Sequence, residues 1–127
     1  MQNIFLSNWV RQLRYKARHR GVTTDISIEG VKEALDLHKN ECIYCGCKET
    51  TPDLAYNLKD NAPAIPANVV PVCKECRGKK KFNDILWMYL NGYIPQDRYV
   101  QALKIICQLD AQKLLTDKIK SGLKGSD

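Results

Sequence analysis

Two Cys-x-x-Cys motifs constrain the fold of this chain more than any other feature. The first is Cys42-Ile-Tyr-Cys45, and the second, which follows after residues 46–72, is Cys73-Lys-Glu-Cys76. Each motif can present two thiolates on one side of a tight turn, and two facing turns make the tetrahedral four-sulfur site that structural zinc prefers. We therefore predict one structural Zn²⁺ ion bound by Cys42, Cys45, Cys73 and Cys76.

Paired cysteines have two alternative explanations. Two disulfides would suit a secreted protein, but the start Met1-Gln-Asn-Ile-Phe-Leu6 has neither the basic region nor the cleavage site of a signal peptide. A redox-active pair is less consistent with two matched motifs. We expect a cytoplasmic location, in a bacterium or a phage-infected host cell, with no membrane partner. Cys107 is expected to be a buried small hydrophobe, and Cys47 stays open as a competing ligand.

The positive charge of the chain is concentrated in two short stretches. The net charge is +6, of which residues 11–20 contribute +5 and residues 74–81 contribute +4, which leaves −3 for the rest. Concentrated positive charge is typical of a surface that binds a polyanion, although a solvated helix face explains either stretch alone equally well. If the two stretches form a surface for nucleic acid, with DNA as the expected ligand, the residues of that surface are Arg11, Arg14, Arg18, Arg77, Lys79, Lys80 and Lys81.

Apolar residues recur at helical spacing in much of the chain, which predicts a mainly helical α+β fold. Ser27 is predicted to cap a helix that runs to about His38. We expect one domain over residues 1–127 with three parts, which are a basic N-terminal helix in 1–21, a zinc module in 22–91 and a long C-terminal helix in 95–123.

The middle of the zinc module is predicted to be a β-hairpin followed by a helix. Residues 50–53 are expected to form a turn, because they contain Thr-Pro-Asp. Residues 54–58 and 69–72 are expected to be the two strands of the hairpin. The helix should begin at about Cys76 and carry residues 79–81 on its exposed side.

Several segments together are similar to a known family. They are Ala17-Arg-His-Arg-Gly21, Asp25-Ile-Ser-Ile-Glu29, Cys42-x-x-Cys45-Gly46, Lys59-Asp60-Asn61, Asn68-Val-Val-Pro71 and Cys73-x-x-Cys76-x-x-Lys79. Through them, residues 14–90 resemble the HNH endonucleases, particularly the phage and bacterial type with a zinc-stabilised ββα-metal fold. The resemblance implies an HNH-like ββα module, DNA as the ligand, and Asn68 as the residue that fixes the loop geometry.

The chain departs from the HNH pattern at the catalytic centre. In that family the first strand ends in a histidine that activates water, usually after an aspartate that helps to hold a metal. The corresponding place here is Tyr56-Asn57-Leu58, and no histidine lies between the two cysteine motifs. An asparagine amide has no useful proton affinity near neutral pH. The resemblance therefore implies a degenerate active-site region at Asn57, Asp60 and Asn68, with no catalytic residue.

Three functions are compatible with these features. The preferred one is a non-catalytic zinc-binding protein that binds nucleic acid through basic helices on the degenerate HNH-like scaffold. A second is an active endonuclease that uses Mg²⁺, with His38 as a relocated base or with Asp53 and Asp60 as metal ligands. A third is a phage-type protein-binding or inhibitory factor, or a homo-oligomer, that acts through the helix in residues 95–123, because its apolar stripe is long for a small domain to cover.

Overall fold

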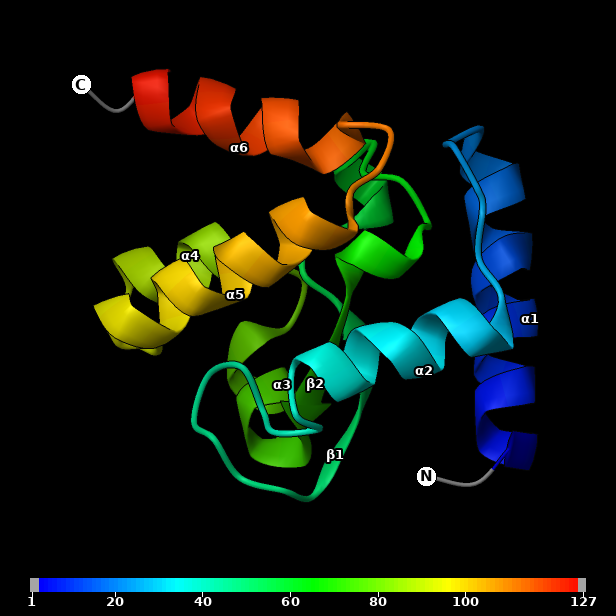
Figure 1. Cartoon of the computed structure of the whole chain (residues 1–127), viewed down its shortest axis with the longest axis horizontal. Helices are drawn as coiled ribbons and strands as arrows, with labels where there is room; N and C mark the ends of the chain where they lie inside the picture. Colours follow the sequence, from blue (N-terminus) through cyan, green and yellow to red (C-terminus); the bar gives the residue numbers. More distant parts are fainter. Residues whose placement is uncertain (1–2, 126–127) are drawn as a thin grey trace.

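The structure, a computed structural model, describes residues 3–125 and is an α+β fold that is mainly helical (Figure 1). This confirms the predicted fold class. The elements in chain order are α1 (Asn3–Arg20), α2 (Ile28–Leu37), β1 (Thr50–Leu54), the 3₁₀ helices η1 (Leu58–Asp60) and η2 (Pro66–Asn68), β2 (Val69–Cys73), α3 (Lys74–Lys80), α4 (Ile85–Leu90), α5 (Gln96–Leu109) and α6 (Leu114–Gly125).

The first two helices confirm the predictions from periodicity and capping. Helix α1 ends before Gly21, whose φ of +65° is a conformation that glycine adopts readily. Helix α2 begins after Ser27, whose hydroxyl oxygen accepts a hydrogen bond of 3.0 Å from the N–H of Gly30. The apolar residues of α1 that recur at helical spacing are all buried, namely Leu6, Val10, Leu13 and Ala17.

Strand β1 lies earlier in the chain than predicted. The strand expected at residues 54–58 and the turn expected at residues 50–53 are both wrong, whereas β2 confirms the strand expected at 69–72. β1 pairs antiparallel with β2, so that Pro52 lies opposite Pro71. The carbonyl of Pro71 accepts the N–H of Ile43 and the carbonyl of Pro52 accepts Arg77, so both prolines direct their polar groups away from the ladder and their missing N–H groups cost no ladder hydrogen bond. Pairing with β2 therefore outweighs the local turn preference of the Thr-Pro-Asp sequence.

The long C-terminal helix predicted over residues 95–123 is in fact two helices, α5 and α6, and this prediction is wrong. The break is at Asp110, which is buried. Its carboxylate accepts hydrogen bonds from the N–H groups of Leu114, Leu115 and Thr116 at 3.1, 2.7 and 2.6 Å. A carboxylate that satisfies three free N–H groups at a helix start stabilises that start strongly. Asp110 therefore starts a new helix where the apolar pattern alone predicts continuation.

Two clusters of buried side chains form the core, and β2 contributes to both. Val69 belongs to the cluster between α1 and α2, whereas Val70 and Val72 belong to the cluster that includes cysteines of both motifs and the C-terminal helices. Figure 1 shows α2 between α1 and the region of β2 and α3. None of the described helices is long and apolar enough to cross a membrane.

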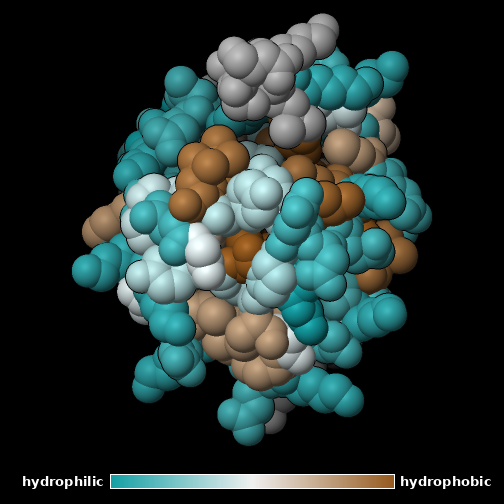
Figure 2. All heavy atoms as spheres, turned by 90° about the vertical axis from the view of Figure 1, so that its left-hand side faces the viewer, coloured by the Kyte–Doolittle hydropathy of each residue, from teal (hydrophilic) through white to brown (hydrophobic). Residues whose placement is uncertain are grey.

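The apolar side of the two C-terminal helices faces mainly inward. The preceding helix, α4, exposes Leu86 and Leu90. Figure 2 views the face where α4 and the start of α5 lie, and the apolar groups on this face are interrupted by hydrophilic ones. The observation that motivated a protein-binding stripe in residues 95–123 is therefore weakened. Val100 and Leu114 of this stripe are exposed. The buried apolar residues of α5 and α6 are Tyr99, Ala102, Ile105, Ile106, Leu115 and Ile119.

Candidate metal centre and basic surface

The first Cys-x-x-Cys motif lies in a tight turn after α2. The N–H of Gly46 donates to the carbonyl of Cys42 at 2.8 Å, and the N–H of Cys42 donates to the carbonyl of Cys47 at 2.8 Å. Gly46 has a φ of +84°, and a Cβ atom at this position would collide with the guanidinium of Arg98. The positive φ favours glycine here, whereas the guanidinium is the end of a flexible side chain that can move aside. The turn that Gly46 permits positions Cys42 beside Cys45.

The second motif joins β2 to α3. Cys73 is the last residue of β2 and the N-cap of α3, where its sulfur accepts a hydrogen bond from the N–H of Cys76 at 3.4 Å. The N–H of Ile43 donates to the carbonyl of Pro71 at 3.1 Å, which attaches the first turn directly to β2. Backbone hydrogen bonds therefore place the two motifs face to face.

The four predicted ligands, Cys42, Cys45, Cys73 and Cys76, form one cluster whose sulfur atoms all lie within 4.8 Å of one another. The sulfurs of Cys45 and Cys73 are 3.6 Å apart. A tetrahedral site with metal–sulfur bonds of about 2.3 Å has sulfur–sulfur separations of about 3.8 Å. The cluster therefore has the dimensions to hold one metal ion, and the prediction that these four cysteines come together is confirmed.

The pKa values of the thiols show that a bound cation would have to replace protons in this cluster. Burial raises the pKa of the Cys42 and Cys76 thiols. Burial also disfavours the Cys73 thiolate, but the N–H of Cys76 and the neighbouring thiols donate to it, so that the pKa of Cys73 falls to about 7. Thiolates this close together repel one another, and a divalent cation removes that repulsion while keeping every ligand deprotonated.

The remaining cysteines lie outside the cluster. Cys47 is not one of the four cysteines whose sulfur atoms lie within 4.8 Å of one another, but its exposed thiol lies beside them and contacts the thiols of Cys73 and Cys45. Cys107 is half-buried on α5 rather than fully buried as predicted. All six cysteines are free thiols in this structure.

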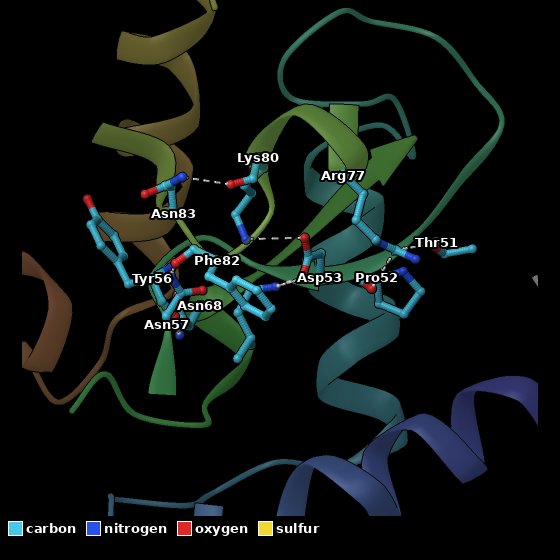
Figure 3. Close-up of polar contacts among 11 residues, drawn as sticks. Thr51, Pro52, Asp53, Tyr56, Asn57, Asn68, Arg77, Lys80, Phe82 and Asn83 are labelled. Atoms are coloured by element: carbon cyan, nitrogen blue, oxygen red, sulfur yellow. Dashed lines mark hydrogen bonds and ion pairs between the residues drawn. The ribbon is translucent and has the colours of Figure 1, made fainter. Parts of the chain in front are cut away.

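Lys80 is not part of the exposed basic surface, contrary to the prediction. It is only 2% exposed, and its ammonium forms an ion pair of 3.3 Å with the carboxylate of Asp53 on β1 (Figure 3). Lys80 follows Cys76 by four residues, so helical spacing places both on the inner side of α3. The sequence therefore already contained a signal that Lys80 faces inward, namely its spacing from Cys76. This ion pair also occupies the carboxylate of Asp53, which was considered as a ligand for Mg²⁺ in the endonuclease alternative.

Two of the three residues expected to form a degenerate active-site region, Asn57 and Asn68, make structural contacts. Asn57 donates its amide N–H to the carbonyl of Phe82 at 2.5 Å (Figure 3). The fully buried Asn68 donates to the carbonyls of Tyr56 and Pro63 at 2.9 and 3.0 Å, and its amide oxygen accepts from the N–H of Tyr56 at 2.9 Å. Asn68 therefore closes the connection between the strands, whereas Asp60 is exposed on η1.

Three other predicted basic residues of the second stretch, Arg77, Lys79 and Lys81, are exposed. Arg77 donates to the carbonyl of Pro52 at 3.2 Å and to the hydroxyl of Thr51, which anchors its guanidinium over β1. Lys79 forms a surface ion pair of 3.5 Å with Glu75. Such exposed pairs contribute little to stability and exchange readily with other anions. Arg77 and Lys79 on α3 and Lys81 at its C-cap thus keep three cationic groups at the surface.

The arginines of α1 lie on a different element. Arg11, Arg14 and Arg18 are exposed, but Arg14 donates to the carbonyl of Ile26 at 2.7 Å and Arg11 donates to the side chain of Asn8. Figure 1 places α2 between α1 and α3, so the two basic stretches are not brought side by side. Any surface that includes both would have to extend around α2.

His38, considered as a relocated base, is enclosed at the end of α2. It is 7% exposed, and its Nε2 atom has no hydrogen-bond partner among the described residues. Burial lowers its pKa to about 4, because the charged imidazolium is poorly solvated there. A histidine that neither reaches water nor binds protons well is a poor general base.

Comparisons with protein-family models, with curated proteins and with solved structures found no match. The class of this protein therefore follows from its fold and its candidate site alone. It is a mainly helical α+β protein with a four-cysteine cluster that can hold one metal ion. The similarity to HNH endonucleases depends on the sequence segments alone.

Proposed function

We propose that the protein binds one structural Zn²⁺ ion on a degenerate HNH-like scaffold and binds nucleic acid without cutting it, with DNA as the expected ligand. Zinc is favoured because the ligand set consists of four cysteines, which is typical of closed structural zinc sites. Mg²⁺ or Ca²⁺ would require oxygen ligands instead.

The exposed cations of α3 are the observation that carries the proposal. This helix starts at the metal-binding residue Cys73, so a bound ion would fix its orientation against the sheet. Arg77, Lys79 and Lys81 then present positive charge from a rigid support. Such groups contact phosphates, release counterions and give affinity with little reading of base sequence.

Two contacts support a role without catalysis. The Asp53 carboxylate is neutralised by the Lys80 ammonium, and a metal ion would have to displace that ammonium to bind there. The Asn57 amide, at the place of the family's histidine, is held by a backbone carbonyl and cannot accept a proton from water. The endonuclease alternative is therefore less well supported than binding alone.

The first prediction concerns Lys79 and Lys81. The double variant Lys79→Ala/Lys81→Ala should weaken binding to two unrelated duplexes by similar factors, because phosphate contacts carry no sequence information. The slope of log K against log salt should fall by about 1.8, since each lost contact removes about 0.9. Fluorescence anisotropy at several salt concentrations measures both quantities.

The matched control is Lys32→Ala/Lys104→Ala, which removes the same charge from exposed positions on α2 and α5. This control should change binding much less. Absence of binding by the parent at low salt, or equal losses in both double variants, would contradict the proposed surface. Cleavage of plasmid DNA with Mg²⁺ by the parent, but not by Cys73→Ser prepared identically, would favour the endonuclease alternative.

A further inference from the structure

The turn between α3 and α4 has an unusual backbone conformation. Lys81 has a φ of +52° and a ψ of −118°, a region that residues with a side chain rarely adopt. Hydrogen bonds hold the turn on both sides of Lys81, from its N–H to the carbonyl of Arg77 at 3.0 Å and from the N–H of Asn83 to the carbonyl of Lys80 at 3.0 Å. Strained residues that the surroundings hold in place are concentrated at functional sites.

The strained turn presents the side chain of Phe82 to solvent. Phe82 is 77% exposed, which is the largest exposure of any large apolar side chain in the described part of the chain. The backbone of Phe82 is nevertheless fixed, because its carbonyl accepts the hydrogen bond from Asn57 (Figure 3). A rigid turn that holds an aromatic ring in water contributes nothing to the core, so a ligand for the ring is the simplest explanation.

Lysine side chains accompany the exposed aromatic rings of this region. The ammonium of Lys59 lies 5.7 Å from the ring centroid of Phe82. The ammonium of Lys79 lies 5.7 Å from the ring centroid of Tyr93, which is 43% exposed and stacks on Trp87. The lysine over Phe82 covers one face of the exposed ring and leaves the other face for a base to stack on, while the ammonium can contact a phosphate.

The surroundings favour nucleic acid over a protein partner. The central parts of protein–protein interfaces are depleted in lysine, whereas both rings here have a lysine over them. The exposed ring also favours unpaired bases. In a duplex the faces of the bases are covered by their neighbours, whereas a single strand offers each base face to an aromatic side chain.

We propose that Phe82 is a stacking surface for unpaired bases, with Lys59, Lys79 and Lys81 as phosphate contacts. The preferred ligand is then single-stranded nucleic acid. This inference rests on the proposed function. It adds that the preferred nucleic acid is single-stranded rather than duplex, which the basic residues alone do not decide.

The test compares a labelled single strand of about 20 nucleotides with a duplex of the same sequence, by fluorescence anisotropy. The parent should bind the single strand more tightly. Phe82→Leu should weaken single-strand binding by about 5- to 150-fold, the range that stacking on one base provides. It should leave duplex binding unchanged, and Phe82→Tyr should keep the parent's affinity. Phe5→Leu, at an exposed ring on α1, is the matched control and should have no effect.

A second readout reports stacking directly. A single strand that contains 2-aminopurine should lose fluorescence on binding to the parent and to Phe82→Tyr, but much less on binding to Phe82→Leu at saturating protein. Unchanged quenching by Phe82→Leu would overturn the stacking role, as would equal losses of affinity in Phe82→Leu and Phe5→Leu. Equal losses for duplex and single strand would overturn the strand preference while leaving the proposed function intact. If the parent binds neither the single strand nor the duplex, both the stacking role and the proposed function are overturned.

Discussion

At the scale of single residues, the pair Lys80–Asp53 shows how burial changes the role of a charged side chain. Lys80 is nearly inaccessible, whereas the Asp53 side chain is 24% exposed. A buried ammonium without a partner is very unfavourable, because it loses its hydration and gains nothing in return. A partly exposed carboxylate without a partner can still be hydrated. Removal of Asp53 should therefore destabilise the protein more than removal of Lys80.

Asp53→Asn should lower the free energy of unfolding by about 3 kcal/mol, because it leaves the Lys80 ammonium buried and unpaired. Lys80→Met should cost less, since Met preserves most of the packed volume and Asp53 remains in contact with water. The double variant should cost less than the two single costs added together. Urea unfolding of the metal-loaded protein measures all three values. Equal single costs, or strict additivity, would contradict the dependence of Lys80 on Asp53.

At the scale of elements, Asp110 decides whether the C-terminal region is one helix or two. Its carboxylate accepts the N–H groups of the first turn of α6, which would otherwise lack partners. The break allows α6 to fold back along α5, so that the apolar sides of both helices contribute to one cluster. Leu115 is fully buried as a result.

Asp110→Ala should lower the free energy of unfolding by about 2 kcal/mol, because it removes a charged helix cap and leaves N–H groups unsatisfied near the core. The matched control is Asp117→Ala, an exposed acidic residue in the same helix, which should change the free energy by less than about 0.5 kcal/mol. Chemical denaturation with far-UV circular dichroism distinguishes the two. Similar costs for both variants would show that the cap does not stabilise α6.

At the scale of the whole molecule, the cysteine cluster connects segments that are distant in the sequence. Two ligands come from the turn after α2, and two come from the junction of β2 and α3. Cys42, Cys73 and Cys76 also belong to the core cluster that includes the C-terminal helices. A bound ion would therefore link the middle of the chain to its C-terminal half.

Removal of the metal should unfold the protein. Structural zinc contributes about 10–16 kcal/mol, whereas a small domain has a net stability of about 5–15 kcal/mol. A strong chelator or Cys73→Ser should abolish cooperative thermal unfolding, whereas Cys47→Ser should retain one zinc ion per chain by elemental analysis. Zinc affinity should fall as the pH is lowered, because burial raises the pKa of Cys42 and Cys76 and both must lose protons to bind. Cooperative unfolding of metal-free protein would contradict the prediction.

The features that were predicted correctly depend on residues close together or on ligand spacing. Helix α1 follows from apolar residues at helical spacing, and α2 follows from the cap at Ser27. The cysteine cluster follows from two Cys-x-x-Cys turns, because thiolates at that spacing can share one ion. The break at Asp110 also has a local signal, an acid before Leu114, but the apolar pattern alone predicts that one helix continues through it.

Other features were decided only by the tertiary structure. Strand β1 forms at Thr50–Leu54 because β2 supplies its hydrogen-bond partners, and this pairing outweighs the turn preference around Pro52. Lys80 leaves the basic surface because Asp53, 27 residues earlier in the chain, compensates its charge. Phe82 is exposed because the turn at Lys81 is held by contacts from both α3 and Asn57. By itself the sequence determined the first two helices, strand β2 and the four clustered cysteines, whereas contacts between distant segments decided which charged and aromatic side chains reach the surface.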